Sequence, residues 1–254
     1  MFLAIDIGNT NLVIGVSTEG KIKKKWRLAT RRDTTRDEYS ILLRSMLRDE
    51  GIEPDLITTG AVCSVVPILT PKIESILRNG FGFDPLVIKP GIKTGLVILY
   101  EPPQDVGADR IVNSVAGYKM FGGPLIIADF GTATTFDIIT AKGEYLGGVI
   151  TPGPAVSAEA LSLRAAKLPR IDLEKPKGVI GRNTIDAMRA GLYYGHPGSC
   201  DRIIEKVYEE LGEKPAVIAT GGLAEAVASE SRYISKVLPD LTLEGLRIIY
   251  EMNI

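Results

Sequence analysis

The feature that most constrains the fold of this chain is an internal repeat built around Asp-x-Gly. Residues 2–16 read FLAIDIGNTNLVIGV, and residues 125–139 read LIIADFGTATTFDII. In each copy two apolar runs flank a short turn, which is the pattern of a β-hairpin. Because such self-similarity indicates repeated architecture, and because the copies start the two halves of the chain, we expect two lobes of similar build, residues 1–120 and 121–254.

The segments around the hairpins alternate between strand and helix patterns. A capping-box spacing at 35–38 predicts a helix whose apolar positions continue to Leu47. Another helix is expected over about 106–120. The remaining predicted elements are strands at 22–28, 56–66, 85–89 and 216–219, a short helix at 71–77, and helices at 184–194 and 201–211. Strands alternating with helices, together with hairpins, predict an α/β fold with mixed sheets.

Glycine and proline predict breaks in the second half. The sequence GGVITPG at 147–153 is expected to form a corner before a helix, and residues 168–176 are expected to be irregular. GHPG at 195–198 is expected to end a helix, which would leave His196 in a surface loop.

Composition excludes several functional classes. The formal net charge is −1 and the charges are interspersed, so we expect no nucleic-acid or membrane partner. A single histidine cannot build a multi-histidine zinc site, and Cys63 and Cys200 have no metal-ligand spacing. Asp6 comes too early for the apolar region of a signal peptide, and we expect a cytoplasmic protein with reduced cysteines.

The first hairpin turn contains residue types that bind phosphate. Gly8 lets the backbone approach a phosphate closely, and the N–H groups with the Asn9 and Thr10 side chains can donate to its oxygens. Asp6 leaves the first strand where it could hold Mg²⁺ or its waters. One copy alone would be read as an ordinary turn, whereas two copies after buried strands favour phosphate binding.

The second hairpin repeats this chemistry. Asp129 is followed by Thr132, Thr134 and Thr135, whose hydroxyls can donate to phosphates or bind a cation. Asp129 would lie across a cleft from Asp6, and two aspartates repel unless a cation lies near them. We therefore expect metal here. The glycines of Thr220-Gly221-Gly222 would permit a flat group such as adenine to approach, although this signal is weak.

The segment Gly107-Ala108-Asp109-Arg110 opens a predicted helix. Asp109 could be a first-turn acid that complements the helix dipole. It could also accept the proton of an attacking hydroxyl, with Arg110 neutralising phosphate or a substrate carboxylate. A surface ion pair would be the simpler interpretation without the flanking motifs.

Together these residues resemble the type III pantothenate kinases of bacteria. The resemblance covers nearly the whole chain in order and rests on the following segments: DIGNTN at 6–11, Tyr100, GADRIVN at 107–113, DFGTATTFD at 129–137, GGVITPG at 147–153, LP at 168–169 and GRNTIDAMRAG at 181–191. It implies two actin-like (ribonuclease H-like) lobes with an ATP cleft between them. It also implies transfer of phosphate from ATP to pantothenate, the first step of coenzyme A synthesis.

The resemblance further implies roles for individual residues. Asp109 would be the catalytic base, and Asp129 would bind a monovalent cation, K⁺ or NH₄⁺, which is required beside Mg²⁺. The ATP contacts would be Asp6, Ile7, Gly8, Asn9, Thr10, Asn11, Leu12, Val13 and Thr132. The pantothenate contacts would be Tyr100, Gly107, Ala108, Asp109, Arg110 and Thr184. A homodimer is implied, in which the second subunit partly completes the pantothenate pocket.

Two other functions stay open from the sequence. One is a kinase or phosphatase of the same superfamily acting on another small polyol or acid, against which Tyr100 and Gly107–Arg110 argue. The other is a non-enzymatic accessory factor, against which the three carboxylates Asp6, Asp109 and Asp129 argue.

Overall fold

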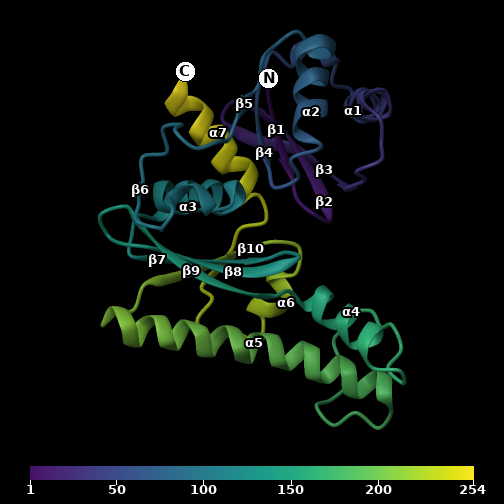
Figure 1. Cartoon of the computed structure of the whole chain (residues 1–254), viewed down its shortest axis with the longest axis vertical. Helices are drawn as coiled ribbons and strands as arrows, with labels where there is room; N and C mark the ends of the chain where they lie inside the picture. Colours follow the sequence, from purple (N-terminus) through teal and green to yellow (C-terminus); the bar gives the residue numbers. More distant parts are fainter. The chain divides into compact units, whose positions relative to one another are not determined.

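The structure is a computed structural model that describes residues 1–254 and divides them into two compact units (Figure 1). Unit 1 consists of Met1–Leu96, Tyr100–Lys119 and Asp240–Ile254. Unit 2 consists of Val97–Leu99 and Met120–Pro239. No helix in the structure is both long enough and apolar enough to cross a bilayer.

This division differs from the predicted boundaries of 1–120 and 121–254 in two places. The C-terminal segment after residue 239 folds with unit 1, because helix α7 (Leu241–Asn253) buries apolar residues against β1 and β4 of that unit. The short segment at 97–99 pairs with a strand of unit 2. Both exchanges join residues distant in sequence, which no local pattern records.

Unit 1 contains a five-stranded mixed sheet in the order β3-β2-β1-β4-β5. Its strands are β1 (Phe2–Ile7), β2 (Asn11–Thr18), β3 (Lys21–Ala29), β4 (Thr59–Ser64) and β5 (Leu86–Val87). Strand β2 runs antiparallel to both β1 and β3, while β4 is parallel to β1 and β5 is parallel to β4.

Unit 2 contains a six-stranded sheet in the order β11-β10-β7-β8-β9-β6. Its strands are β6 (Val97–Ile98), β7 (Leu125–Phe130), β8 (Ala133–Ile139), β9 (Glu144–Pro152), β10 (Ala216–Thr220) and β11 (Lys236–Val237). The run β9-β8-β7-β10-β11 has the same order and the same strand directions as β3-β2-β1-β4-β5. The repeat seen in the sequence is therefore a repeat of topology, with β6 added at one edge.

Helices accompany each sheet. In unit 1 they are α1 (Arg36–Asp49), α2 (Thr70–Ile76), most of α3 (Ala108–Phe121) and α7, with 3₁₀ turns at Pro54–Leu56 and Pro103–Asp105 and a π turn at Leu77–Phe81. In unit 2 they are α4 (Pro154–Arg164), α5 (Thr184–Leu211) and α6 (Ala224–Ala228). The predicted capping box is present, since the Thr35 hydroxyl accepts from the Glu38 N–H and the Glu38 side chain accepts from the Thr35 N–H.

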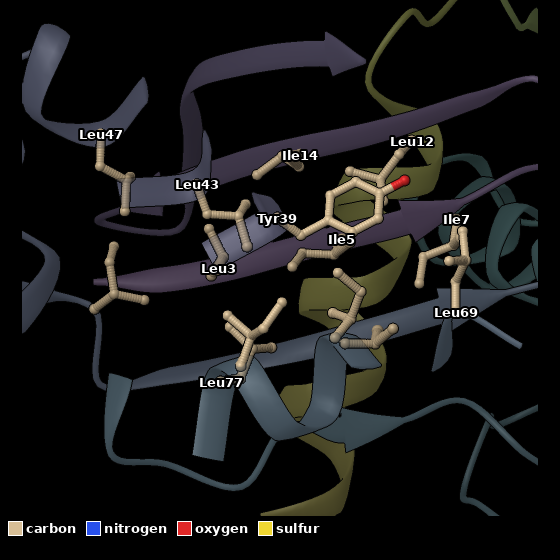
Figure 2. Packing of buried hydrophobic residues seen from close by; sticks show 14 of the residues in the cluster. Leu3, Ile5, Ile7, Leu12, Ile14, Tyr39, Leu43, Leu47, Leu69 and Leu77 are labelled. Carbon is tan, nitrogen blue, oxygen red and sulfur yellow. The ribbon is translucent and has the colours of Figure 1, made fainter. Parts of the chain in front are cut away.

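Side-chain alternation along β1 separates the core of unit 1 from its first functional residue. Leu3, Ile5 and Ile7 are fully buried and pack with apolar residues of α1 and α2 (Figure 2). Successive side chains of a strand point to opposite faces of the sheet, so Asp6 lies on the face away from this core. That face is covered by α7, whose Leu243 lies so close to Gly15 that a side chain there would collide with it.

The core of unit 2 follows the same rule. Ile126, Ala128 and Phe130 of β7 are buried against α5 and α6. Asp129 lies between Ala128 and Phe130, so its side chain is on the opposite face. In each unit the aspartate of the hairpin thus lies on the face of the sheet opposite the core described above.

Two predictions about the second half are wrong. Residues 147–152 form part of β9 and make no corner. Gly147 has φ 128° where the β8–β9 register shifts, so this glycine serves a bulge inside a strand. His196 is not in a loop, because α5 runs without a break from Thr184 to Leu211 and contains Pro197.

The persistence of α5 through Pro197 has a physical explanation. Proline in a helix interior typically costs about 3 kcal/mol. Helix residues on both sides of it, Met188 and Leu192 before and Cys200 and Ile204 after, are buried, and burying each such side chain is worth roughly 1.5–3 kcal/mol. Tertiary packing therefore outweighs the local preference for a break.

Candidate active site

The first hairpin turn is a tight backbone loop at the end of β1. The Gly8 N–H donates to the Asn11 carbonyl at 3.0 Å. A Cβ at Gly8 would lie 3.0 Å from that same carbonyl oxygen, which is tighter than most side chains tolerate. Asn9 and Thr10 are exposed at the tip of the turn. Glycine therefore permits the tight turn, and the polar tip is open to a ligand.

Asp6 has a buried thiol as its neighbour on the next strand. Asp6 pairs with Cys63 in the parallel β1–β4 register. Burial raises the pKa of the Cys63 thiol well above its ordinary value, and the negative charges of Asp6 and Asp109 raise that pKa further. Asp6 and Asp109 both belong to unit 1, and both act electrostatically on this thiol.

Asp109 occupies the first turn of α3 in a mostly buried position. Its Oδ1 accepts a hydrogen bond from the Arg110 backbone N–H at 2.8 Å. Burial raises the pKa of the Asp109 carboxyl, while that hydrogen bond and the Arg110 charge act in the opposite direction. A carboxylate with a raised pKa is closer to the range of a useful proton acceptor. Perturbed carboxyls of this kind are enriched at functional sites.

Gly107 leaves the space that the Asp109 carboxylate occupies. A Cβ at Gly107 would lie 2.5 Å from Asp109 Oδ1, a distance that would push the carboxylate away. Arg110 is buried, whereas Tyr100 is half-buried in the loop that precedes the 3₁₀ turn at Pro103–Asp105. The structure therefore brings Gly107, Asp109 and Arg110 together with Asp6 in unit 1.

The second hairpin carries Asp129 and Thr132 in unit 2. Asp129 pairs with Thr135 of β8 on one side and with Thr220 of β10 on the other. Directly after Thr220, Gly221 has φ 96°, and a Cβ there would lie 2.5 Å from Asp129 Oδ1. The backbone of Gly221 thus packs directly beside the carboxylate. The side chain of any other residue at this position would collide with it.

The turn of the second hairpin is held by the backbone that leads into α4. The Gly131 N–H donates to the Ala133 carbonyl at 3.1 Å, and the Gly153 N–H donates to the Thr132 carbonyl at 3.0 Å. A Cβ at Gly153 would lie 2.3 Å from the Gly131 carbonyl oxygen. Thr132 is exposed at this turn.

Thr184 lies in unit 2, at the first position of α5. The helix cap is Asn183, whose side-chain oxygen accepts from the Asp186 N–H at 2.9 Å. Thr184 is exposed and lines a hollow of about 740 Å³. The same hollow is lined by further residues of α5, by Leu161 of α4 and by Leu168. Its hydroxyl is therefore not needed to cap the helix, and it borders a space large enough for a small molecule.

The sequence analysis missed several residues that shape these sites. The sequence predicts that Cys63 is unpaired, and both cysteines are free and buried. It does not predict that Cys63 lies beside Asp6 on the neighbouring strand. The sequence predicts that Gly221 lets adenine approach, whereas in the structure Gly221 lies beside Asp129. The sequence predicts that Gly153 belongs to a corner, whereas in the structure its N–H donates to the Thr132 carbonyl and holds that turn. No sequence signal marks these contacts, because each joins segments far apart in the chain.

The residues present can accept ions without a preformed metal cage. The structure contains no group of three or more His, Cys, Asp or Glu side chains that could hold a metal ion. Mg²⁺ in phosphoryl-transfer sites typically takes one or two carboxylates and completes its shell with phosphate oxygens and water. Asp6 beside an open turn fits that pattern, and Asp129 with the Gly221 backbone beside it offers a second carboxylate site.

Two α/β units with the same sheet topology, each with an Asp-x-Gly hairpin, define an actin-like fold. The fold is similar to that of a ROK family glucokinase from Streptomyces griseus, solved with glucose and AMPPNP, with TM-score 0.55 and 11% identity over 98% of this chain and 99% of that one. It is also similar to a conserved putative Baf family transcriptional activator from Campylobacter jejuni, with TM-score 0.58 and 21% identity over 99% and 98%. These likenesses show the fold alone.

Sequence comparison identifies the family. The family model of type III pantothenate kinase matches residues 2–206. The chain is 49% identical to a type III pantothenate kinase of Pelobacter propionicus over 253 residues, which cover 100% of both chains. The chain therefore belongs to the type III pantothenate kinase family.

Proposed function

We propose that this protein transfers the γ-phosphate of ATP to a hydroxyl of pantothenate and forms 4′-phosphopantothenate, the first step of coenzyme A biosynthesis. The observation that carries this proposal is the half-buried Asp109 carboxylate in the first turn of α3, in a chain that belongs to a family of pantothenate kinases. The segment Gly107–Arg110 that presents Asp109 is the one that resembles the pantothenate motif of that family.

Asp109 is the group we assign to the acceptor hydroxyl. In phosphoryl transfer the transition state is loose, so the main work of the protein is positioning and charge stabilisation. The Asp109 carboxylate orients the hydroxyl and takes its proton, and burial supports this role by raising the carboxyl pKa. Arg110 contributes a fixed positive charge next to it.

The two hairpins are the groups we assign to ATP. Backbone N–H groups in the turn at 6–13 donate to phosphate oxygens, as in other glycine-containing anion sites, and Thr132 supplies a hydroxyl. Asp6 holds Mg²⁺ directly or through water. An ion held there would supply positive charge against the charge that develops on the phosphate oxygens.

Asp129 is the residue we assign to a monovalent cation, K⁺ or NH₄⁺. The support is its carboxylate, the threonine Thr135 paired with it, and the Gly221 backbone close to Oδ1. A cation there reduces the negative potential that a carboxylate would otherwise present to phosphate.

Tyr100, Gly107–Arg110 and Thr184 are the residues we assign to pantothenate. Pantothenate has a carboxylate, an amide and two hydroxyls, so a site for it needs several donors. The hollow beside Thr184 and the charge of Arg110 support this assignment.

We also propose that the protein is a cytoplasmic homodimer. Three large apolar side chains of unit 2, Leu163, Val179 and Ile180, are 66%, 67% and 88% exposed. Val179 and Ile180 are neighbours in the chain, and apolar side chains that are exposed together are typical of interfaces, so a second copy is the occupant we assign. Ile180→Asp should convert the dimer to a monomer in analytical ultracentrifugation, and an unchanged mass would show that another face is used.

The experiment that tests the function is a substrate comparison with purified protein. ADP release is measured with ATP, Mg²⁺ and K⁺, once with pantothenate and once with each of a set of sugars and hydroxy acids. We expect turnover with pantothenate and little with the others. Turnover with another polyol but not with pantothenate would assign this chain to a different kinase activity, and no turnover at all would favour an accessory factor.

A further inference from the structure

Thr30 makes two hydrogen bonds to the turn of the first hairpin. It follows β3 directly and is half-buried. Its hydroxyl donates to the Gly8 carbonyl at 2.7 Å. Its backbone N–H donates to the Thr10 carbonyl at 2.9 Å. One residue outside the Asp-x-Gly motif therefore holds both ends of the turn.

These two bonds fix the direction in which the turn presents its donors. In a trans peptide the C=O and the following N–H lie in one plane and point in opposite directions. When Thr30 holds the Gly8 carbonyl, the Asn9 N–H must point away from Thr30. When Thr30 holds the Thr10 carbonyl, the Asn11 N–H must also point away. Backbone N–H groups aimed out of a turn are the donors of backbone anion sites.

The segment that carries Thr30 is itself anchored to unit 1. The Tyr39 hydroxyl donates to the Arg31 carbonyl at 2.9 Å and accepts from the Arg31 N–H at 3.2 Å. Tyr39 is buried in the core of that unit, as Figure 2 shows. The Lys72 ammonium donates to the Arg32 carbonyl at 3.1 Å and to the Thr34 carbonyl at 2.8 Å. The two bonds to the turn therefore start from a fixed segment.

We propose that Thr30 is a positioning residue for ATP, which holds the peptide groups of residues 8–11 in the orientation that binds phosphate. This inference rests on the proposed role of the first hairpin in ATP binding. Thr30 acts through the turn and touches no substrate. Donors oriented in advance bind charge without reorganisation when the ligand arrives, so loss of this orientation weakens phosphate binding.

The hydroxyl is the part of Thr30 that substitution can test. The bond from its backbone N–H survives any side chain, whereas the bond to the Gly8 carbonyl needs the hydroxyl. Thr30→Val keeps the shape and removes the donor, and Thr30→Ser keeps the donor. Thr94→Val is the matched control, because Thr94 is also half-buried in unit 1 and its hydroxyl also donates to a backbone carbonyl, that of Leu96.

The measurements are KM for ATP, KM for pantothenate, and the dissociation constant of the Mg²⁺ complex of a non-hydrolysable ATP analogue by calorimetry. We expect Thr30→Val to raise KM for ATP and the analogue's dissociation constant about 3- to 10-fold, which corresponds to one hydrogen bond of ordinary strength. KM for pantothenate should stay within about two-fold, an allowance well below one ordinary hydrogen bond. Thr30→Ser should restore ATP binding, and Thr94→Val should leave it unchanged.

The outcomes separate this inference from the proposed function. Unchanged analogue binding in Thr30→Val overturns the positioning role, even if pantothenate turnover is normal in the wild type. Absence of pantothenate turnover in the wild type overturns the proposed substrate, and analogue binding then still decides the role of Thr30. If Thr30→Val does not fold, Thr30→Ala removes the same donor without bulk and is measured in its place.

Discussion

The two hairpins occupy equivalent positions in the two sheets, and their turns share one supporting backbone bond but differ in a side-chain bond. In unit 1 the turn carbonyls of Gly8 and Thr10 accept from a threonine, Thr30. In unit 2 the Thr132 carbonyl accepts from the backbone of Gly153, where α4 is about to begin. Because Gly153 follows β9 as Thr30 follows β3, the backbone bond is the same in both copies, whereas the hydroxyl bond from Thr30 to the Gly8 carbonyl is one that Gly153, with no side chain, cannot make.

The carboxylates of the two hairpins differ in the same way. Asp6 has the Cys63 thiol as its partner on the parallel neighbour β4, and Asp129 has Thr220 on the equivalent strand β10. Only after β10 does a glycine with positive φ pack against the carboxylate. We interpret this difference as support for the proposal that the two carboxylates bind different ions. Asp6 would bind the Mg²⁺ of the nucleotide, and Asp129 would bind a monovalent cation.

The largest effect is expected at Asp109, because the proposed function assigns the proton of the acceptor hydroxyl to this carboxylate of unit 1. Asp109→Asn should lower kcat about 10²–10⁴-fold, the usual contribution of a general base, while binding of the ATP analogue changes little. Asp105→Asn is the control, since it removes an exposed carboxylate nearby in sequence. Near-normal kcat in Asp109→Asn would leave Asp109 as a helix-start acid only.

The same variant should change the pH dependence of stability. Burial raises the folded-state pKa of Asp109 above its ordinary value of 3.8, so the folded state binds this proton more tightly than the unfolded state. The group's contribution to stability is therefore greatest below the unfolded pKa and is lost as pH rises through the folded pKa. Asp109→Asn should unfold at a higher temperature than wild type at neutral pH, and a lower temperature would contradict the burial argument.

The next effect separates the two carboxylates by their ions. Dialysed enzyme assayed in Tris should gain activity when K⁺ is added at constant ionic strength. Asp129→Asn should lose about 10- to 100-fold in K⁺ affinity, by analogy with other groups that support bound metals. Asp6→Asn should instead raise the Mg²⁺ requirement. A wild-type rate that ignores K⁺ would remove the distinction between the two hairpins.

A smaller effect, on stability, is expected at the glycine that distinguishes Asp129. Gly221→Ala should lower the free energy of unfolding in urea by about 2–4 kcal/mol, because it combines positive φ with collisions at Asp129 Oδ1 and the Phe130 backbone. Gly212→Ala isolates the backbone term, since Gly212 has φ 70° and open space around it. An equal decrease in the free energy of unfolding in both variants would show that the collision with Asp129 costs no stability.

The smallest effect is expected at Thr184. Thr184→Val should raise KM for pantothenate a few-fold, the equivalent of about one hydrogen bond, and leave the melting temperature unchanged because Asn183 caps the helix. Asn183→Ala supplies the opposite pattern, with about 1 kcal/mol of lost stability. A Thr184→Val variant that is destabilised but has normal KM values would assign Thr184 to the helix end alone.

Most elements of both sheets could be predicted from local sequence. Alternation in β1 and β7 and the capping box at Thr35 are local signals, and the structure confirms both hairpins and α1. The exceptions have tertiary causes. Buried residues on both sides of Pro197 keep α5 continuous, and the bulge at Gly147 lies within a strand.

The candidate site was predictable only as motifs. Asp6 and Asp109 could be named from the sequence, but the pairing of Asp6 with Cys63 depends on the β1–β4 register, and the half-buried position of Asp109 depends on where α3 starts. Thr30 and Gly221 carry no local mark of their contacts, because a threonine after a strand and a glycine before a helix are common. Long-range pairing, which local periodicity does not encode, decides these positions.

The most direct test of the account is to follow the phosphate itself. Purified protein is incubated with ATP labelled at the γ-phosphate, Mg²⁺, K⁺ and pantothenate, and the products are separated and identified by mass. We expect the label in 4′-phosphopantothenate with wild type and almost none with Asp109→Asn. Label that appears only as free phosphate, or that reaches pantothenate equally well with Asp109→Asn, would contradict the account.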